Sequence, residues 1–195
     1  MKLVFFDNYD SFTFNLVHYL REIGAEVVVI DQESALLHEF EDFQADALVV
    51  GPGPNSPSEA GPLLTYLSAC MQRQVPVLGV CLGHQALGEL MGLTLQKAQF
   101  PMHGKSSLLA HGSEDIFEGI SSPMQVGRYH SLVVAEAQEK IENLKILMQD
   151  ECGQIMAFRH SDKPFWGIQF HPESVLTPEG KNLLRNWIRK IDSML

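Results

Sequence analysis

One cysteine of this 195-residue chain stands in a pattern typical of an enzymatic nucleophile. Cys81 lies between Gly79 and Gly83, after an apolar run and before an amphipathic segment, and this is the thiol counterpart of the Gly-x-Ser-x-Gly elbow. The glycines give room for a sharp strand-to-helix turn, and the amino end of the helix favours a thiolate over a thiol. We therefore predict that Cys81 is a nucleophile and that the N–H of Leu82 is an oxyanion donor.

The bland alternative for Cys81 is a buried free thiol in a tightly packed turn. Two glycines at fixed offsets favour the nucleophile. The other two cysteines have no such surroundings: we expect Cys70 to pack in the core, and Cys152 to be a turn residue. The odd number and wide spacing of the three cysteines exclude a disulfide framework and leave too few clustered ligands for a zinc site.

A nucleophilic cysteine needs a base, and the base needs a group that orients it. His171 directly follows a predicted strand, Phe165–Phe170, and Pro172 keeps the chain out of a helix so that Glu173 can turn back to the imidazole. We predict that His171 is the base and Glu173 its orienting carboxylate. Two alternatives remain: a loop histidine beside a solvated glutamate, and a metal site that combines both residues with Cys81.

A loop rich in glycine and proline, residues 51–57, follows another predicted strand. It lacks the Gly-Lys-Ser/Thr ending of a phosphate-binding loop, and its prolines remove backbone N–H groups, which argues against a nucleotide site. A rigid loop that presents the N–H of Gly53 is the better interpretation, and an ordinary stiff connection is the alternative.

Composition limits the possible partners. The net charge is −10 with a sequence pI near 5.2, and no basic run is present, which argues against nucleic acid and anionic membranes as partners. The apolar runs are far shorter than the roughly 18 residues that span a bilayer. We expect a cytoplasmic protein with one domain over residues 1–195 and 45% hydrophobic residues to fill its core.

Strand and helix patterns alternate along the first half of the chain. Helices are predicted at about 11–23, 34–40, 58–72, 83–91 and 178–191, and strands at 2–6, 26–30, 46–50, 75–80, 125–130, 144–149, 154–159 and 165–170. Continuous apolar strands between amphipathic helices favour an α/β fold with an open, mostly parallel sheet covered by helices on both faces. The closely spaced strands of the last third predict an antiparallel extension.

Taken together, these residues resemble the class I (triad-type) glutamine amidotransferases over essentially the whole chain. Six motifs in order carry the resemblance: Asp7-Asn8-Tyr9-Asp10-Ser11-Phe12-Thr13, Pro52-Gly53-Pro54 with Pro57 and Ala60-Gly61, Cys81-Leu82-Gly83-His84-Gln85, His103-Gly104-Lys105, Arg128-Tyr129-His130-Ser131-Leu132 and Phe170-His171-Pro172-Glu173-Ser174. Within the family, the chain is most similar to the glutaminase subunits of anthranilate synthase and aminodeoxychorismate synthase. Asn55 stands where many anthranilate-type members carry glycine, which leaves the branch open.

The resemblance implies a flavodoxin-like fold and a catalytic triad of Cys81, His171 and Glu173 that hydrolyses L-glutamine. It implies oxyanion donors at Gly53 and Leu82, and contacts to the two ends of the glutamine. These contacts would come from Gln85, Ser131 and Leu132. It implies no cofactor or metal, and a separate chorismate-using synthase subunit as the partner that receives ammonia.

The same resemblance suggests a partner surface at Tyr9 and Phe12, against the alternative that both residues staple the first helix to the core. Two other functions on this fold are a catalytically silent regulatory subunit and a γ-glutamyl or cysteine peptidase. The complete set of nucleophile, base and orienter argues against the first. Gln85 and the motif at 128–132 argue against the second, because they match a pocket for free glutamine.

Overall fold

The computed structural model describes residues 1–136 and 141–194. Its helices are α1 Thr13–Glu22, α2 Gln32–Leu37, α3 Leu63–Gln72, α4 Leu82–Leu90 and α5 Gly180–Asp192, with 3-10 helices η1 Phe40–Phe43, η2 Pro57–Glu59 and η3 Asp115–Phe117. Its strands are β1 Lys2–Phe6, β2 Glu26–Ile30, β3 Ala47–Val50, β4 Val77–Val80, β5 Thr94–Lys97, β6 Lys105–Leu109, β7 Met124–Arg128, β8 Leu132–Ala135, β9 Leu144–Gln149, β10 Ile155–His160 and β11 Phe165–Ile168.

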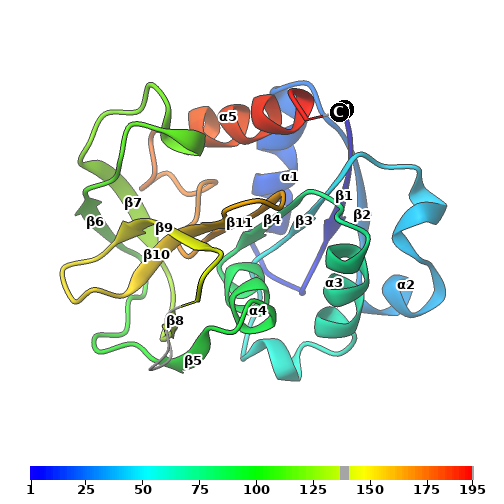
Figure 1. Cartoon of the computed structure of the whole chain (residues 1–195), viewed down its shortest axis with the longest axis horizontal. Coiled ribbons are helices and arrows are strands. Elements are labelled where there is room, and N and C mark those ends of the chain that lie inside the picture. Colours follow the sequence, from blue (N-terminus) through cyan, green and yellow to red (C-terminus); the bar gives the residue numbers. More distant parts are fainter. Residues whose placement is uncertain (137–140, 195) are drawn as a thin grey trace.

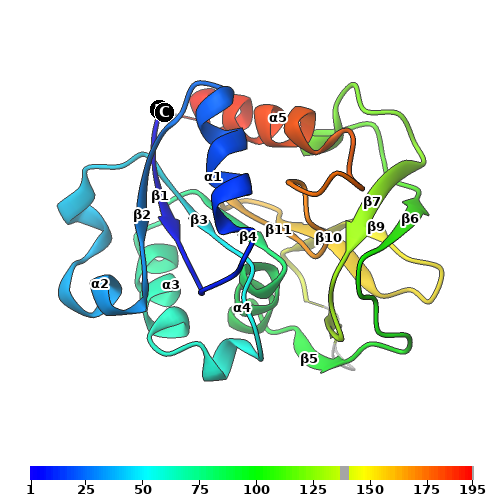
Figure 2. The ribbon, with the colours of Figure 1, turned by 180° about the vertical axis from the view of Figure 1, so that it is seen from behind.

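The main sheet has seven strands in the order β2-β1-β3-β4-β11-β10-β9 (Figure 1). The first five pair in parallel, and β10 and β9 extend the sheet antiparallel. Helices α1 and α5 lie on one face, whereas α3 and α4 lie on the other, as the view from behind also shows (Figure 2). The predicted fold class, a mostly parallel sheet between helices with an antiparallel extension, is confirmed.

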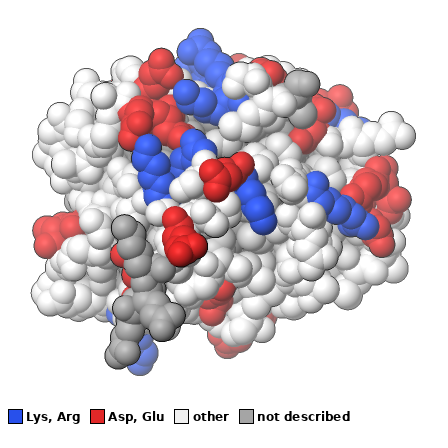
Figure 3. All heavy atoms as spheres, viewed as in Figure 1, with Lys and Arg blue, Asp and Glu red and all other residues white. Residues whose placement is uncertain are grey.

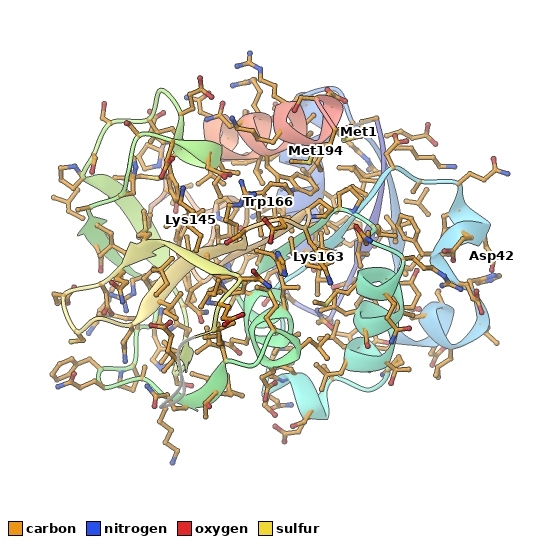
Figure 4. The ribbon with its side chains drawn as sticks, viewed as in Figure 1. Met1, Asp42, Lys145, Lys163, Trp166 and Met194 are labelled. Atoms are coloured by element: carbon orange, nitrogen blue, oxygen red, sulfur yellow. The ribbon has the colours of Figure 1, made fainter. Side chains whose placement is uncertain are left out.

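Alternating side chains of the buried strands fill two cores, one on each face of the sheet. On β1, Leu3 and Phe5 pack into the core shared with α1 and α5, and Val4 and Phe6 pack into the core shared with α3 and α4. Trp166 on β11 is fully buried and lies near the middle of the molecule (Figure 4). Because both faces are covered, these strands are apolar without interruption, as the sequence pattern indicated.

The last third differs from the prediction in two respects. The strand predicted at 125–130 is β7, which pairs with β6 in a separate two-stranded sheet and not with the antiparallel extension. The strand predicted at 165–170 is antiparallel to β10 but parallel to β4, so it joins the two halves of the main sheet. Short turns between strands predict pairing between neighbours in the sequence. They do not show which strands from distant parts of the chain pair with each other.

Two helices also begin or end elsewhere than predicted. The helix predicted at 58–72 begins at Leu63, because Gly61 has a φ of 56° and Pro62 occupies the N-cap. The helix predicted at 34–40 is α2 followed by η1, and α2 begins earlier because the Asp31 carboxylate accepts a hydrogen bond from the N–H of Ser34 at 2.8 Å. Three observed strands, β5, β6 and β8, were not predicted. Of these, β5 and β6 are largely exposed and lack a continuous apolar run, so their sequences carry no clear strand pattern.

Across the described ranges, no helix combines the length and the apolar character needed to cross a membrane. On the face shown in Figure 3, basic and acidic side chains are interspersed.

Helix α4 packs unusually close to the strands that it follows. A Cβ added to Gly79 of β4 would lie 2.3 Å from the carbonyl oxygen of Gly83, and one added to Gly83 would lie 2.3 Å from the carbonyl oxygen of Val50. Both obstacles are backbone atoms that no rotamer change can move. The two glycines are therefore required by the approach of the helix to the sheet.

We expect Gly83→Ala to lower the free energy of unfolding by about 1 kcal/mol, because overpacking costs about 1–3 kcal/mol and outweighs the gain of about 1 kcal/mol in helix propensity. Urea denaturation measures the change. Gly112→Ala is the control, since its Cβ would find only a side-chain atom at 3.8 Å. Equal midpoints for Gly83→Ala and the unsubstituted protein would contradict the packing argument.

Candidate active site

Cys81 occupies the turn between β4 and α4 in a strained backbone conformation. Its φ is 54° and its ψ is −102°, in a region that a residue with a Cβ enters only at a cost of about 1–3 kcal/mol. The Cys81 N–H donates to the carbonyl of Ile168 at 2.9 Å, and its carbonyl accepts from the N–H of Gln85 at 3.1 Å. These bonds hold the thiol, which is 6% exposed, at the amino end of α4.

His171 reaches the same edge of the sheet because β11 runs parallel to β4. The pairing of Ile168 with Val80 brings the carboxyl ends of both strands together. The His171 N–H donates to the carbonyl of Gly127 at 3.0 Å, and Nδ1 lies 2.6 Å from Oε1 of Glu173. With Nδ1 facing a carboxylate, the imidazole directs Nε2 away from Glu173.

The thiol and the imidazole interact. Burial alone would lower the pKa of His171, but the Cys81 thiolate and the Glu173 carboxylate outweigh it, so the pKa lies well above its ordinary value. Nε2 of His171 is buried and makes no hydrogen bond to any of the described residues, and the charge of the Cys81 thiolate is the largest of the causes that raise the histidine pKa. The arrangement can therefore hold a thiolate beside an imidazolium.

Two other histidines near the site have lowered pKa values, in contrast to His171. His84 is fully buried against Phe158, with ring centroids 4.7 Å apart, and burial lowers its pKa to about 3. Burial, together with the charge of Arg128, lowers the pKa of His130 to about 4. Both imidazoles are therefore neutral near pH 7, whereas His171 is charged.

The two predicted oxyanion donors lie on adjacent segments. A Cβ added to Gly53 would lie 2.5 Å from Cβ of Asn8 and 2.7 Å from Cδ2 of Leu82, so the loop after β3 touches the first residue of α4. The N–H groups in the first turn of a helix have no partner within the helix, and that of Leu82 belongs to this set. Asn55, in the same loop, has a φ of 62°, a conformation that asparagine and glycine both adopt.

The residues predicted to hold the ends of the substrate lie beside the elbow. Gln85, 3% exposed on α4, donates from Nε2 to the carbonyl of Leu132 at 3.0 Å. Leu132 begins β8 and is half-buried, whereas Ser131 is exposed. The segment 131–132 is thereby tied to the helix that begins at the nucleophile.

Sequence reasoning missed two buried groups of this site. Gln169 donates from Nε2 to the Cys81 sulfur at 3.7 Å, and Asp150 forms a buried ion pair with Arg128 at 2.7 Å. The signal for Gln169 was a polar residue between Ile168 and Phe170, in a segment otherwise apolar. Asp150 stood in a turn of exposed appearance, and its partner is 22 residues away.

A pocket opens on the outer side of the imidazole and its carboxylate. It is lined by Phe12, Asn15, Tyr129, His171, Glu173, Ser174 and Val175. The ring of Tyr129 packs edge-on against His171 with centroids 4.9 Å apart, and its hydroxyl lies 3.1 Å from that of Ser174. This pocket connects the base to a surface where Phe12 is 48% exposed and Val175 is 90% exposed.

Known proteins share this sequence and this fold. The sequence profile of the family described as "Glutamine amidotransferase class-I" matches residues 4–191. Aminodeoxychorismate/anthranilate synthase component 2 of Bacillus subtilis is 44% identical over 186 residues, which are 95% of both chains. Anthranilate synthase component 2 of Thermus thermophilus is 43% identical, over 96% of this chain and 92% of its own. The fold is shared with a solved glutamine amidotransferase from Thermotoga maritima, at 15% identity and a TM-score of 0.77, over 98% of this chain and 97% of that one.

We expect Cys81→Ala to lower the pKa of His171, because removing the thiolate leaves only the Glu173 carboxylate to oppose the effect of burial. NMR titration of ring-labelled histidine measures the shift. Cys152→Ser, at an exposed turn, serves as the control and should leave the titration unchanged. An unaltered His171 titration in Cys81→Ala would show that the two groups do not interact.

Proposed function

Because the chain belongs to the class I glutamine amidotransferase family, we propose that it is the glutaminase subunit of an anthranilate synthase. In this role it hydrolyses L-glutamine and supplies ammonia to a separate chorismate-using subunit. The observation that carries the proposal is the buried Cys81–His171–Glu173 arrangement at the carboxyl ends of two parallel strands. The same proposal places the protein in the cytoplasm.

In the first half-reaction, the Cys81 thiolate attacks the side-chain amide carbon of glutamine and forms a C–S bond. The N–H groups of Gly53 and Leu82 stabilise the oxyanion, and losing one such donor typically costs about 10²–10³ in rate. The His171 imidazolium gives its proton to the amide nitrogen, the C–N bond breaks, and ammonia leaves. The products are a γ-glutamyl thioester and a neutral imidazole, which Glu173 holds in place.

In the second half-reaction, neutral His171 removes a proton from water, and the oxygen of that water adds to the thioester carbon. The C–S bond then breaks to release glutamate, and the thiolate–imidazolium pair is restored. These steps consume one glutamine and one water and yield one glutamate and one ammonia. None of these steps calls on a cofactor or a metal.

We expect Cys81→Ser to reduce glutamine hydrolysis on the order of 10³-fold or more, because a serine hydroxyl is not ionised by this imidazole. The assay measures ammonia and glutamate released from glutamine. Cys152→Ser is the matched control, with the same atom exchange at an exposed turn, and should retain full activity. Undiminished ammonia release from Cys81→Ser would refute the nucleophile assignment.

The partner surface is proposed to lie around the outer pocket. Tyr9 is 57% exposed and Phe12 is 48% exposed, which favours a docking role over the alternative that both rings staple α1 to the core. Val175, on the other side of the pocket, is 90% exposed and directly follows the residues that hold His171. A synthase subunit seated on these residues would cover the pocket that reaches the base, so ammonia could pass between subunits without entering solvent.

We expect Val175→Asp to weaken association with the chorismate-using subunit about tenfold or more, since a charge would be buried at the interface. Sedimentation or interferometry with the purified partner measures the affinity. Leu37→Asp, at a 78% exposed leucine on α2, places the same charge elsewhere and should bind normally. Equal affinities of the two variants would move the interface away from this pocket.

A second candidate function differs only in the partner. The Bacillus subtilis relative carries both names, aminodeoxychorismate and anthranilate synthase component 2. A chain serving the folate branch, or both branches, would use the same glutaminase chemistry. The product formed from chorismate and glutamine with each candidate large subunit distinguishes the branches.

A further inference from the structure

Gln169 is fully buried, and both polar atoms of its side chain have hydrogen-bond partners. It follows the last residue of β11, and its backbone N–H donates to the carbonyl of Met156 at 2.8 Å. Its amide oxygen accepts from Nε2 of Gln85 at 3.2 Å, and its amide nitrogen lies 3.7 Å from the Cys81 sulfur. A buried amide that made neither contact would destabilise the fold, so the core could tolerate an apolar residue here more readily than an unpaired glutamine.

The direction of this hydrogen-bond chain is set by a backbone carbonyl. The oxygen of Leu132 can only accept, so the side chain of Gln85 must present its NH₂ group there. The same nitrogen uses its second hydrogen toward Gln169, which must therefore present its oxygen. The remaining NH₂ group of Gln169 is left facing the sulfur, because reversing either amide would oppose two donors or two acceptors.

We propose that Gln169 is a positioning residue whose amide N–H holds the Cys81 sulfur in the thiolate form and aims it into the site. The inference rests on the proposed function only in taking Cys81 as the nucleophile. A hydrogen bond donated to a charged form favours that form, and here the donor is fixed before any substrate arrives. The thiolate thus receives one fixed neutral donor in addition to the imidazolium and the helix terminus.

The titratable groups around this sulfur come from several elements. His171 and Glu173 follow β11, His84 lies on α4, and His130 lies between β7 and β8 with the Arg128–Asp150 ion pair behind it. The pKa values of about 3 for His84 and about 4 for His130 keep both neutral above pH 5 or so. A change in the titration of Cys81 above that pH therefore reports on its pairing with His171 and on its hydrogen-bond donors.

The test is the pH dependence of Cys81 alkylation by iodoacetamide, followed by mass spectrometry of the peptide that contains Cys81. Gln169→Met removes the donor while keeping the length of the side chain, and Gln72→Met makes the same exchange at an exposed site on α3. We expect the midpoint of Gln169→Met to rise by about one pH unit and that of Gln72→Met to stay unchanged. A loss of packing alone would alter the limiting rate at high pH but not the midpoint.

An unchanged or lowered midpoint in Gln169→Met would overturn the proposal. If that variant does not fold, Gln169→Leu takes its place. The unsubstituted protein offers an independent reading, since the side-chain amide protons of Gln169 should shift in NMR spectra with the midpoint of Cys81 and should lose that step in Cys81→Ala. Absence of the step in the unsubstituted protein would also overturn it.

Alkylation needs neither glutamine nor a partner subunit, so this result is separate from the proposed function. A raised midpoint in a protein that does not hydrolyse glutamine would support the positioning role and refute the glutaminase. Normal glutamine hydrolysis by the unsubstituted protein, together with an unchanged alkylation midpoint in Gln169→Met, would support the glutaminase and refute the positioning role.

Discussion

The parallel pairing of β11 with β4 is the constraint on which the site depends. The two strands are separated by more than eighty residues, yet the register that pairs Ile168 with Val80 brings their carboxyl ends to the same edge. Cys81 follows one strand and His171 the other, so a slip in this register would separate thiol from imidazole. The close approach of α4 to the sheet, which requires glycine at 79 and 83, fixes the position of the helix that begins after Cys81.

Near this edge of the sheet, the buried histidines differ in their protonation. Burial alone would keep every imidazole neutral, and His84 and His130 follow that rule. His171 departs from it because the charges of the Cys81 thiolate and of the Glu173 carboxylate, which contacts Nδ1, favour its protonated form. Neutral neighbours matter to this balance, since a second buried cation would compete with His171 for the same thiolate.

The proposed function gives the two sides of the imidazole different roles. The residues proposed to contact glutamine lie on α4 and at the start of β8, whereas the pocket beside His171 and Glu173 is also lined by Phe12 and Val175. Substrate and ammonia would thus use different sides of the imidazole. Under the proposed function, the arrangement suits a subunit whose product is consumed by another protein, and it would account for the large apolar side chains exposed next to the buried base.

Local patterns determined much of this protein by themselves. Glycine spacing, strand and helix periods and the motif at 170–174 indicated the elbow, the fold class and the residue types of a nucleophile, a base and an orienter, because these features depend on residues close in sequence. Only the tertiary structure decided that β7 leaves the main sheet, that β11 pairs with β4, that Gln169 reaches Cys81 and that Asp150 pairs with Arg128. Strand order and buried hydrogen bonds join residues far apart in the chain, so no local period records them.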